Sequence, residues 1–204
     1  MRLFFSTTSP YARIARIALA EKGLAFEPTL TDPWNDAPGL LAANPSARVP
    51  ALLLDSGLPL TESLLIVLWL ETQRPQPSLL GDRPDRAISR AGVAMGAIDA
   101  AAAIIISRRI DPNFDESPVG LRRRRSVIGA LERLEADPPT LADAATDGTA
   151  DLAAITTVVL LDYIRFRFAT AAWVPATKRL DELAARARRR PSFADTLPRE
   201  MPKP

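Results

Sequence analysis

The chain has 204 residues, of which 47% are hydrophobic and 25% charged, as in an ordinary folded protein with one large or two small domains. It contains no cysteine and no histidine, which excludes disulfide bonds, zinc sites with such ligands, thiol redox catalysis and serine–histidine triads. Its formal net charge of +2 is close to balance and indicates no general polyanion partner.

The first predicted strand and helix meet at a polar loop near the N-terminus. The apolar run Leu3-Phe4-Phe5 predicts a buried strand. Ser9 and Pro10 are typical of the N-cap and the first position of a helix, and we expect Gly23 to end that helix. Helical spacing predicts that Tyr11 faces the core. The hydroxyl of Ser9 would then lie at the positive end of a helix dipole, which favours anions.

Short strands and two helical segments are predicted after this helix. They are a strand over 24–30 in which Pro28 indicates a sheet edge or a strand end, a loop over 31–43 with one helical turn, a strand over 51–54, a hairpin turn over 55–57, a return strand over 58–60 and a helix over 62–73. Thr61 is expected to cap the helix over 62–73, and the apolar stripe of this helix is expected to consist of Leu65, Leu68 and Trp69.

The composition changes after a proline-rich linker. Helical patterns cover 85–109, 118–136, 151–168 and 175–189, with no further strand signal. Arg108 and Asp162 end apolar runs that are too short to cross a membrane, and the N-terminus has no signal-peptide pattern. We therefore expect a cytoplasmic protein with an α+β part followed by an all-α part.

Five short motifs resemble, in this order, those of the glutathione transferase superfamily. They are Ser-Pro-Tyr-Ala-Arg at 9–13, Asn-Pro-Ser-Ala-Arg-Val-Pro at 44–50, Thr-Glu-Ser at 61–63, Asp-Gly-Thr-Ala-Asp at 147–151 and Arg-Pro-Ser-Phe-Ala at 190–194. The resemblance spans nearly the whole chain. It implies a thioredoxin-like glutathione-binding domain over 1–76, a linker over 77–84 and an all-α helical-bundle domain over 85–204.

The resemblance also implies a binding site for reduced glutathione. Pro50 would follow a cis peptide bond, and the N–H and C=O of Val49 would pair with the cysteinyl backbone of glutathione like an added strand. Ser63 would bind the γ-glutamyl carboxylate at a helix N-terminus, and Glu62 would accept from the ammonium group. Arg48 would reach the glycyl carboxylate.

Catalysis is assigned to Ser9, which would face the sulfur of glutathione and stabilise its thiolate. A free thiol has a pKa of about 8.5, so only a small fraction is ionised at neutral pH. A hydroxyl hydrogen bond and the helix dipole could lower that pKa by about one to two units. Ser6, Thr7 and Thr8 are nearby rivals, and Tyr11 is a weaker one.

The implied protein is a homodimeric detoxifying transferase of alkyl or aryl groups, similar to bacterial serine-type, theta-like and zeta-like members. Its other substrate would be a small hydrophobic electrophile bound between the two domains, with no metal, nucleic acid or membrane involved. The alternatives are a glutathione-dependent isomerase or dehalogenase on the same site, and a non-catalytic interaction protein on the same fold.

Asp151 is expected to serve the structure, because the family has a capping box before its core helix. Gly148 stands here where that box has Ser or Thr, so the cap is expected to be weaker or to use Thr149.

The sequence allows two interpretations for each of several other residues. Trp34 could border the ligand cleft or anchor its loop, and Asp99 and Arg108 could line the electrophile pocket or a dimer contact. The arginine runs at 122–125 and 186–190 are interpreted as solvated surface with local ion pairs, because consecutive helical residues fan around the axis.

Overall fold

The computed structural model of the protein describes residues 1–141 and 148–201, and contacts divide these into two compact units. The first unit comprises 1–79, 148–150 and 188–201, and the second comprises 80–141 and 151–187. Residues 188–201 therefore belong by their contacts to the first unit, although the sequence motifs place them in the helical domain.

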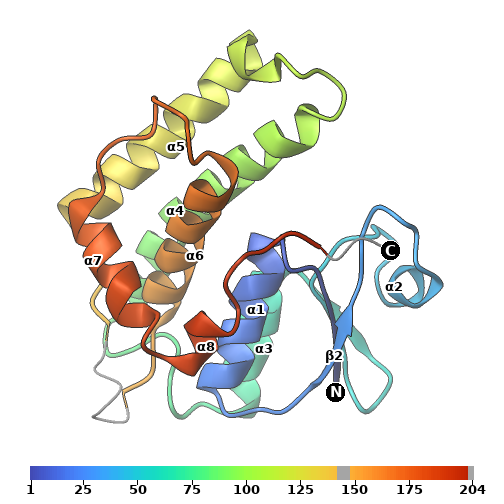
Figure 1. Ribbon diagram of the computed structural model, residues 1–204. Coiled ribbons are helices and arrows are strands. Elements are labelled where there is room, and N and C mark those ends of the chain that lie inside the picture. The colour runs from blue at the N-terminus through green and yellow to red at the C-terminus, as the bar shows by residue number, and fades with distance from the viewer. Residues whose placement is uncertain (142–147, 202–204) are drawn as a thin grey trace. The chain divides into compact units, whose positions relative to one another are not determined.

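The first unit is built on a four-stranded sheet with the order β2-β1-β3-β4 (Figure 1). Its strands are β1 (Arg2–Phe5), β2 (Glu27–Leu30), β3 (Ala51–Leu53) and β4 (Pro59–Thr61), and its helices are α1 (Pro10–Glu21), α2 (Pro38–Ala43), α3 (Ser63–Gln73) and α8 (Pro191–Ala194). β1 pairs in parallel with β2 and antiparallel with β3, and β3 pairs antiparallel with β4. Of the two positions predicted for Pro28, the structure shows the sheet edge, because β2 is the outer strand next to β1.

Alternating side chains of β1 face opposite sides of the sheet, as the pleat requires. The guanidinium of Arg16 in α1 lies 4.6 Å from the ring centre of Phe5. A side chain at Gly39 of α2 would meet the ring of Phe4 at 3.4 Å. The two aromatic residues therefore place α1 and α2 on opposite faces, and α1 contacts α3 and α8.

The start and the buried face of α3 differ from the sequence prediction. Thr61 pairs with Ala51 as the last residue of β4, and Glu62, rather than Thr61, is the N-cap. Leu65 and Leu68 are 58% and 59% exposed, so they do not form the buried stripe. The helix instead buries Ser63, Ile66, Val67 and Leu70. Residues 64–70 are all apolar, and their periodicity therefore could not identify the inner face.

A buried lysine fixes the chain where the first unit ends. Lys22, only 1% exposed, donates hydrogen bonds of 2.6 Å to the carbonyl oxygens of Arg74 and Pro77 and pairs with Glu71. Glu71 also accepts from the N–H of Leu79 at 2.8 Å. The first residues of the predicted linker are thus held against the C-terminal end of α1.

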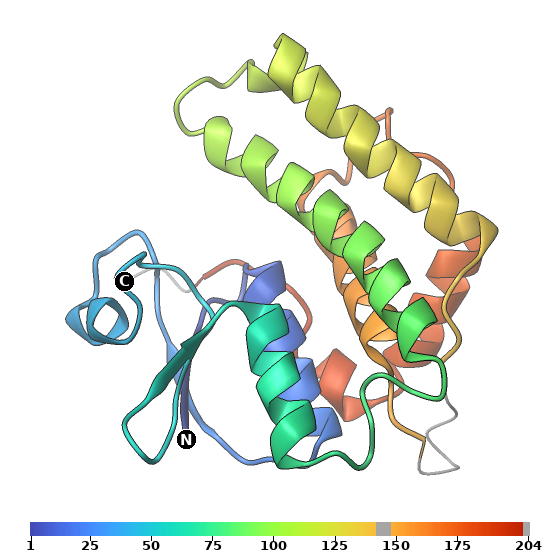
Figure 2. The ribbon, with the colours of Figure 1, turned by 180° about the vertical axis from the view of Figure 1, so that it is seen from behind.

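In the described residues of the second unit, all regular secondary structure is helical (Figure 2). It consists of α4 (Pro84–Ser107), the short 3-10 helix η1 (Phe114–Glu116), α5 (Pro118–Ala136), α6 (Leu152–Arg167) and α7 (Lys178–Ala187). α4 packs against α5 and α6, and α7 packs against α6. All residues of α6 from Leu152 to Ile164 are buried, which makes α6 the core helix of this unit.

α4 has nearly the bounds of the predicted helix over 85–109 and is strongly apolar. An 18-residue window within it has a mean hydropathy of 1.5, which by length and composition alone is enough to cross a membrane. However, α4 buries nine of its residues and lies against both α5 and α6. These properties are those of a core helix that packs against other helices.

Asp151 itself caps α6. Its Oδ1 accepts a hydrogen bond of 2.8 Å from the N–H of Ala154. This arrangement confirms the structural role expected for Asp151, and the cap does not depend on Thr149. Burial raises the pKa of the Asp151 carboxyl, and the hydrogen bond from Ala154 opposes that rise.

Candidate functional site

Ser9 occupies the predicted position at the start of α1. Its Oγ accepts a hydrogen bond of 3.1 Å from the N–H of Ala12, and Pro10 follows as the first helical residue. The side chain is half-buried. Within the described residues no acceptor is recorded for the Ser9 hydroxyl hydrogen, which leaves this hydrogen available to a ligand.

The neighbouring hydroxyl groups are engaged with one another or with the C-terminal segment. Ser6 Oγ and Thr8 Oγ1 lie 3.0 Å apart, and Ser6 Oγ also accepts from the N–H of Thr8 at 3.3 Å. Thr7 Oγ1 donates to the sulfur of Met201 at 3.3 Å. These contacts favour Ser9 over its three rivals as the hydroxyl that meets a ligand.

A buried asparagine shapes the loop before β3. Asn44, 6% exposed, donates from Nδ2 to the carbonyl oxygen of Arg48 at 2.8 Å and accepts from the N–H of Ser46 at 3.1 Å. Ala47 between them has a φ of 51°. The peptide bond between Val49 and Pro50 is cis, as predicted.

The backbone of Val49 is unpaired. The residue is 8% exposed, and in the described part of the chain neither its N–H nor its C=O makes a hydrogen bond. A buried backbone group without a partner costs about 1–3 kcal/mol. Val49 therefore offers one donor and one acceptor to an extended peptide-like ligand beside β3.

Two candidate residues lie at the N-terminus of α3. Glu62 has a φ of 65°, a left-handed conformation that is uncommon for a residue other than glycine and is often found at functional sites. Ser63 is 2% exposed and lies in the first turn, where no side chain caps the helix. Its hydroxyl has no partner among the described residues. The free N–H groups and this hydroxyl suit a carboxylate.

Arg48 approaches the same helix terminus. Its Nη1 lies 3.5 Å from Oε1 of Glu62, and both side chains are more than half exposed. A pair this exposed contributes little to stability. It nevertheless holds a cation and an anion side by side, which complements a ligand that carries both charges.

Similarity to known proteins identifies the family of this chain. Residues 8–73 match the model of the glutathione S-transferase N-terminal domain. The chain is 30% identical to the GST-like protein YibF of Escherichia coli over 97% of this chain and 98% of the relative. The chain belongs to the glutathione S-transferase superfamily.

The chain is also similar to a solved glutathione S-transferase and, over a shorter stretch, to an isomerase. A glutathione S-transferase of Methylobacterium radiotolerans, solved in complex with glutathione sulfonate, is 33% identical, with a TM-score of 0.87 over 100% of this chain and 97% of that one. A maleylacetoacetate isomerase of Pseudomonas aeruginosa is 41% identical over 96 residues, which are 45% of this chain and 44% of the isomerase.

Sequence patterns did not identify two residues that contact Arg48, namely Tyr11 and Asn44. Tyr11 does not point into the core but is half-buried, with the guanidinium of Arg48 at 6.0 Å from its ring centre. Asn44 positions Arg48 through its carbonyl, and the only signal for it was an asparagine in a turn-forming sequence.

Arg108 has a structural role in the helical unit. It forms two hydrogen bonds with Asp115, of 2.7 and 2.6 Å, and its guanidinium lies 4.9 Å from the ring centre of Phe168. These bonds hold the pKa of the buried Asp115 below its usual value.

Asp99 is exposed on α4, and Trp34 is 54% exposed, which disfavours a packed anchor.

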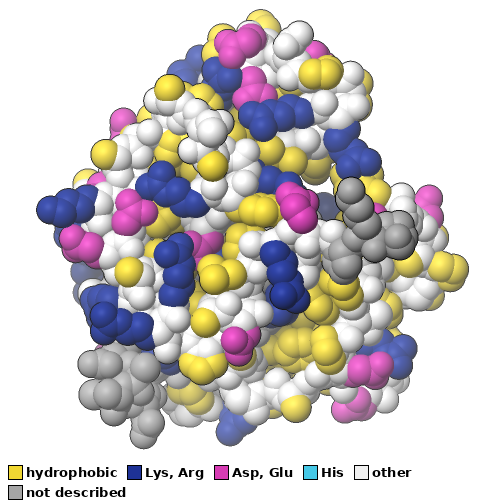
Figure 3. All heavy atoms as spheres, in the orientation of Figure 1, with side chains coloured by type: hydrophobic (Ala, Val, Ile, Leu, Met, Phe, Trp, Pro, Cys, Tyr) yellow, Lys and Arg dark blue, Asp and Glu magenta, His cyan; other side chains and the backbone are white. Residues whose placement is uncertain are grey.

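The arginine runs contain several intramolecular ion pairs. Arg124 pairs with Asp115 and Glu116, and Arg190 pairs with Glu21. On the face drawn in Figure 3, basic and acidic side chains are interspersed. The described residues contain no cluster of three acidic side chains suited to a metal ion.

Proposed function

We propose that the protein binds reduced glutathione, stabilises its thiolate and transfers it to a small hydrophobic electrophile. The observation that carries this proposal is the unpaired N–H and C=O of the buried Val49. Both groups suit the backbone of a bound tripeptide, and the charged ends of glutathione then have partners on either side.

Each end of glutathione is assigned to a separate group of this unit. The γ-glutamyl carboxylate binds the N-terminus of α3 and the hydroxyl of Ser63, and its ammonium binds Glu62. Arg48 binds the glycyl carboxylate. The cysteinyl residue pairs with Val49 beside Pro50, which directs its sulfur toward Ser9.

Ser9 then acts on the thiol. Its hydroxyl donates a hydrogen bond to the thiolate, and the α1 dipole adds to the stabilisation, so that the thiol proton passes to water at neutral pH. The thiolate attacks the electrophilic carbon, a C–S bond forms, and the leaving group departs with its bonding electron pair. The hydroxyl keeps its proton throughout.

The same proposal includes a cytoplasmic homodimer that detoxifies electrophiles. Three leucines on the outer face of α3, namely Leu64, Leu65 and Leu68, are between 37% and 59% exposed. An apolar face of this kind supports contact with a second copy. The oligomeric state in solution, measured by light scattering, tests this part.

An isomerase is the second candidate function. It is supported by the 41% identity to a maleylacetoacetate isomerase over 96 residues. Such a reaction uses the same glutathione site and returns glutathione unconsumed. Parallel assays with a cis-enone, a haloacid and an activated aryl chloride separate isomerisation, dehalogenation and conjugation.

The test is calorimetric titration of the protein with reduced glutathione. We expect saturable binding that the double variant Glu62→Ala, Ser63→Ala abolishes. The control Thr72→Ala, at the exposed C-terminal end of α3, keeps wild-type affinity. Absence of both heat and thermal stabilisation at millimolar glutathione would contradict the proposal and favour a non-catalytic interaction protein.

A further inference from the structure

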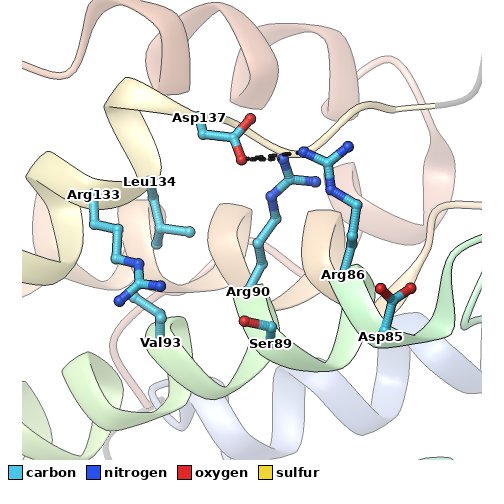
Figure 4. Close-up of a pocket in the computed structure, with 8 residues that line it drawn as sticks. All are labelled: Asp85, Arg86, Ser89, Arg90, Val93, Arg133, Leu134 and Asp137. Carbon is cyan, nitrogen blue, oxygen red and sulfur yellow. Dashed lines mark hydrogen bonds and ion pairs between the residues drawn. The ribbon is translucent and has the colours of Figure 1, made fainter.

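A pocket in the helical unit is lined by arginine side chains and lies outside the glutathione site (Figure 4). It has a volume of about 250 Å³ between the first turns of α4 and the last turn of α5. Its lining residues are Asp85, Arg86, Ser89, Arg90, Val93, Arg133, Leu134 and Asp137.

The positive charge in this pocket exceeds what its carboxylates neutralise. Asp137 accepts from Nη2 of Arg90 at 2.5 Å and from Nη2 of Arg86 at 3.4 Å, so one carboxylate serves two guanidinium groups. Asp85 is paired with Arg83, which does not line the pocket, at 3.0 Å. In the described part of the chain no ion pair is recorded for Arg133.

The arrangement leaves hydrogen-bond donors available. A guanidinium carries five N–H groups, and the contacts with Asp137 use one nitrogen each of Arg86 and Arg90. Figure 4 shows Asp137 bridging these two guanidinium groups, with Arg133 on the opposite wall. The hydroxyl of Ser89 lies on the floor between them and has no partner among the described residues.

The rest of the lining is apolar. Val93 of α4 and Leu134 of α5 lie beside Arg133 (Figure 4). Leu134 is 1% exposed and lies behind the pocket surface, so the half-buried Val93 supplies most of the accessible apolar lining. A ligand with a compact anionic head and a small apolar body matches both parts of this lining.

We propose that this pocket binds a small organic phosphate or sulfate monoester. Arg90 and Arg133 hold the anionic oxygens from two sides, Ser89 donates to the same group, and the apolar body lies against Val93 and Leu134. Guanidinium forks match the oxygens of phosphate and sulfate geometrically. The site is independent of the proposed glutathione chemistry, since it shares no residue with it.

The test is calorimetric titration of the full chain with phenyl phosphate and, separately, with inorganic phosphate, at constant ionic strength set with sodium chloride. We expect phenyl phosphate to bind with a Kd on the order of 1 mM or tighter. Its apolar ring should make it bind more tightly than inorganic phosphate. Arg133→Gln should weaken binding about tenfold, because it removes one charge-assisted contact without breaking an ion pair.

Two matched variants complete the experiment. Arg122→Gln, which changes an exposed arginine of the same helix outside the pocket, should keep wild-type affinity. Ser63→Ala should also keep it, which shows that the anion does not bind at α3. Equal affinity of the Arg133→Gln and Arg122→Gln variants, or no saturable binding at all, would overturn the proposal.

Discussion

Glu21 and Arg190, which are 169 positions apart, form a two-pronged buried ion pair. Nε and Nη2 of Arg190 lie 3.0 and 2.6 Å from the two carboxylate oxygens of Glu21. Glu21 also accepts from the N–H of Ala150 and from the hydroxyl of Ser192, and Arg190 donates to the carbonyl of Gly148. One carboxylate thus joins α1 to the turn before α6 and to the C-terminal segment.

Replacing Arg190 by alanine should destabilise the fold by about 3–5 kcal/mol, because it leaves the carboxylate of Glu21 buried without its charge partner. Arg190→Lys should recover only part of that loss, since lysine cannot form the two-pronged contact. The control Arg189→Ala, at an exposed neighbour, should stay within about 0.5 kcal/mol of wild type. Chemical denaturation measures all three, and equal stability of the variants at 189 and 190 would contradict the assigned role.

Ser9→Ala should abolish most glutathione-dependent turnover while leaving glutathione affinity nearly unchanged. The lost hydroxyl hydrogen bond should raise the pKa of the bound thiol by about one unit, which corresponds to about 1.4 kcal/mol. The pH profile of turnover should therefore move to higher pH by the same amount. Ultraviolet absorbance of the bound thiolate measures the shift directly.

Ser9→Ala also removes the N-cap of α1, which costs about 1 kcal/mol of stability. Ser117→Ala is the matched control, because Ser117 caps α5 through a hydrogen bond of 3.0 Å from the N–H of Gly120 and lies outside the site. Both variants should lose similar stability, and only Ser9→Ala should lose turnover. Unchanged turnover in Ser9→Ala would refute the catalytic assignment.

Two glycines of α5 should respond in opposite ways to substitution by alanine. A Cβ at Gly120 would lie 2.0 Å from the carbonyl oxygen of Phe114, whereas a Cβ at Gly129 would meet nothing within 4 Å. Gly120→Ala should therefore destabilise by about 1–3 kcal/mol, because the backbone must shift. Gly129→Ala should stabilise by about 0.5–1 kcal/mol through higher helix propensity. Thermal unfolding of both variants checks the contrast.

Asp151→Asn should change how stability depends on pH. Burial raises the pKa of Asp151 in the folded chain, so the folded chain binds its proton more tightly than the unfolded chain does. The contribution of Asp151 to stability is therefore gained as the pH falls through the raised pKa and is complete below the unfolded value. Asparagine keeps the cap and does not titrate. The Asp151→Asn variant should therefore exceed wild type in free energy of unfolding most at neutral pH, and this difference should shrink on acidification.

Asp151→Ala is the control for the cap itself. It should lose about 0.5–2 kcal/mol relative to Asp151→Asn at every pH, because only the hydrogen bond to Ala154 is removed. Denaturant titrations between neutral and acidic pH measure both differences. A gap between wild type and Asp151→Asn that does not vary with pH would contradict the raised pKa.

Elements with local signals could be predicted from the amino-acid sequence alone. Ser9 and Pro10 defined the start of α1, the helix over 118–136 was predicted with the bounds that α5 has, and Pro28 marked an edge strand. Caps, proline positions and apolar periodicity act within a few residues, and their physical effect is therefore visible in a single chain.

Three other features are visible only in the folded chain: the buried face of α3, the direction of the Tyr11 side chain and the partners of Glu21. The unbroken apolar run over 64–70 gives no periodic contrast, so only the packed structure shows that Ile66 is buried and Leu65 exposed. Glu21 meets Arg190 across 169 positions, and the arginine pocket combines the two ends of separate helices. Such contacts depend on how distant segments come together in space, which local sequence patterns do not encode.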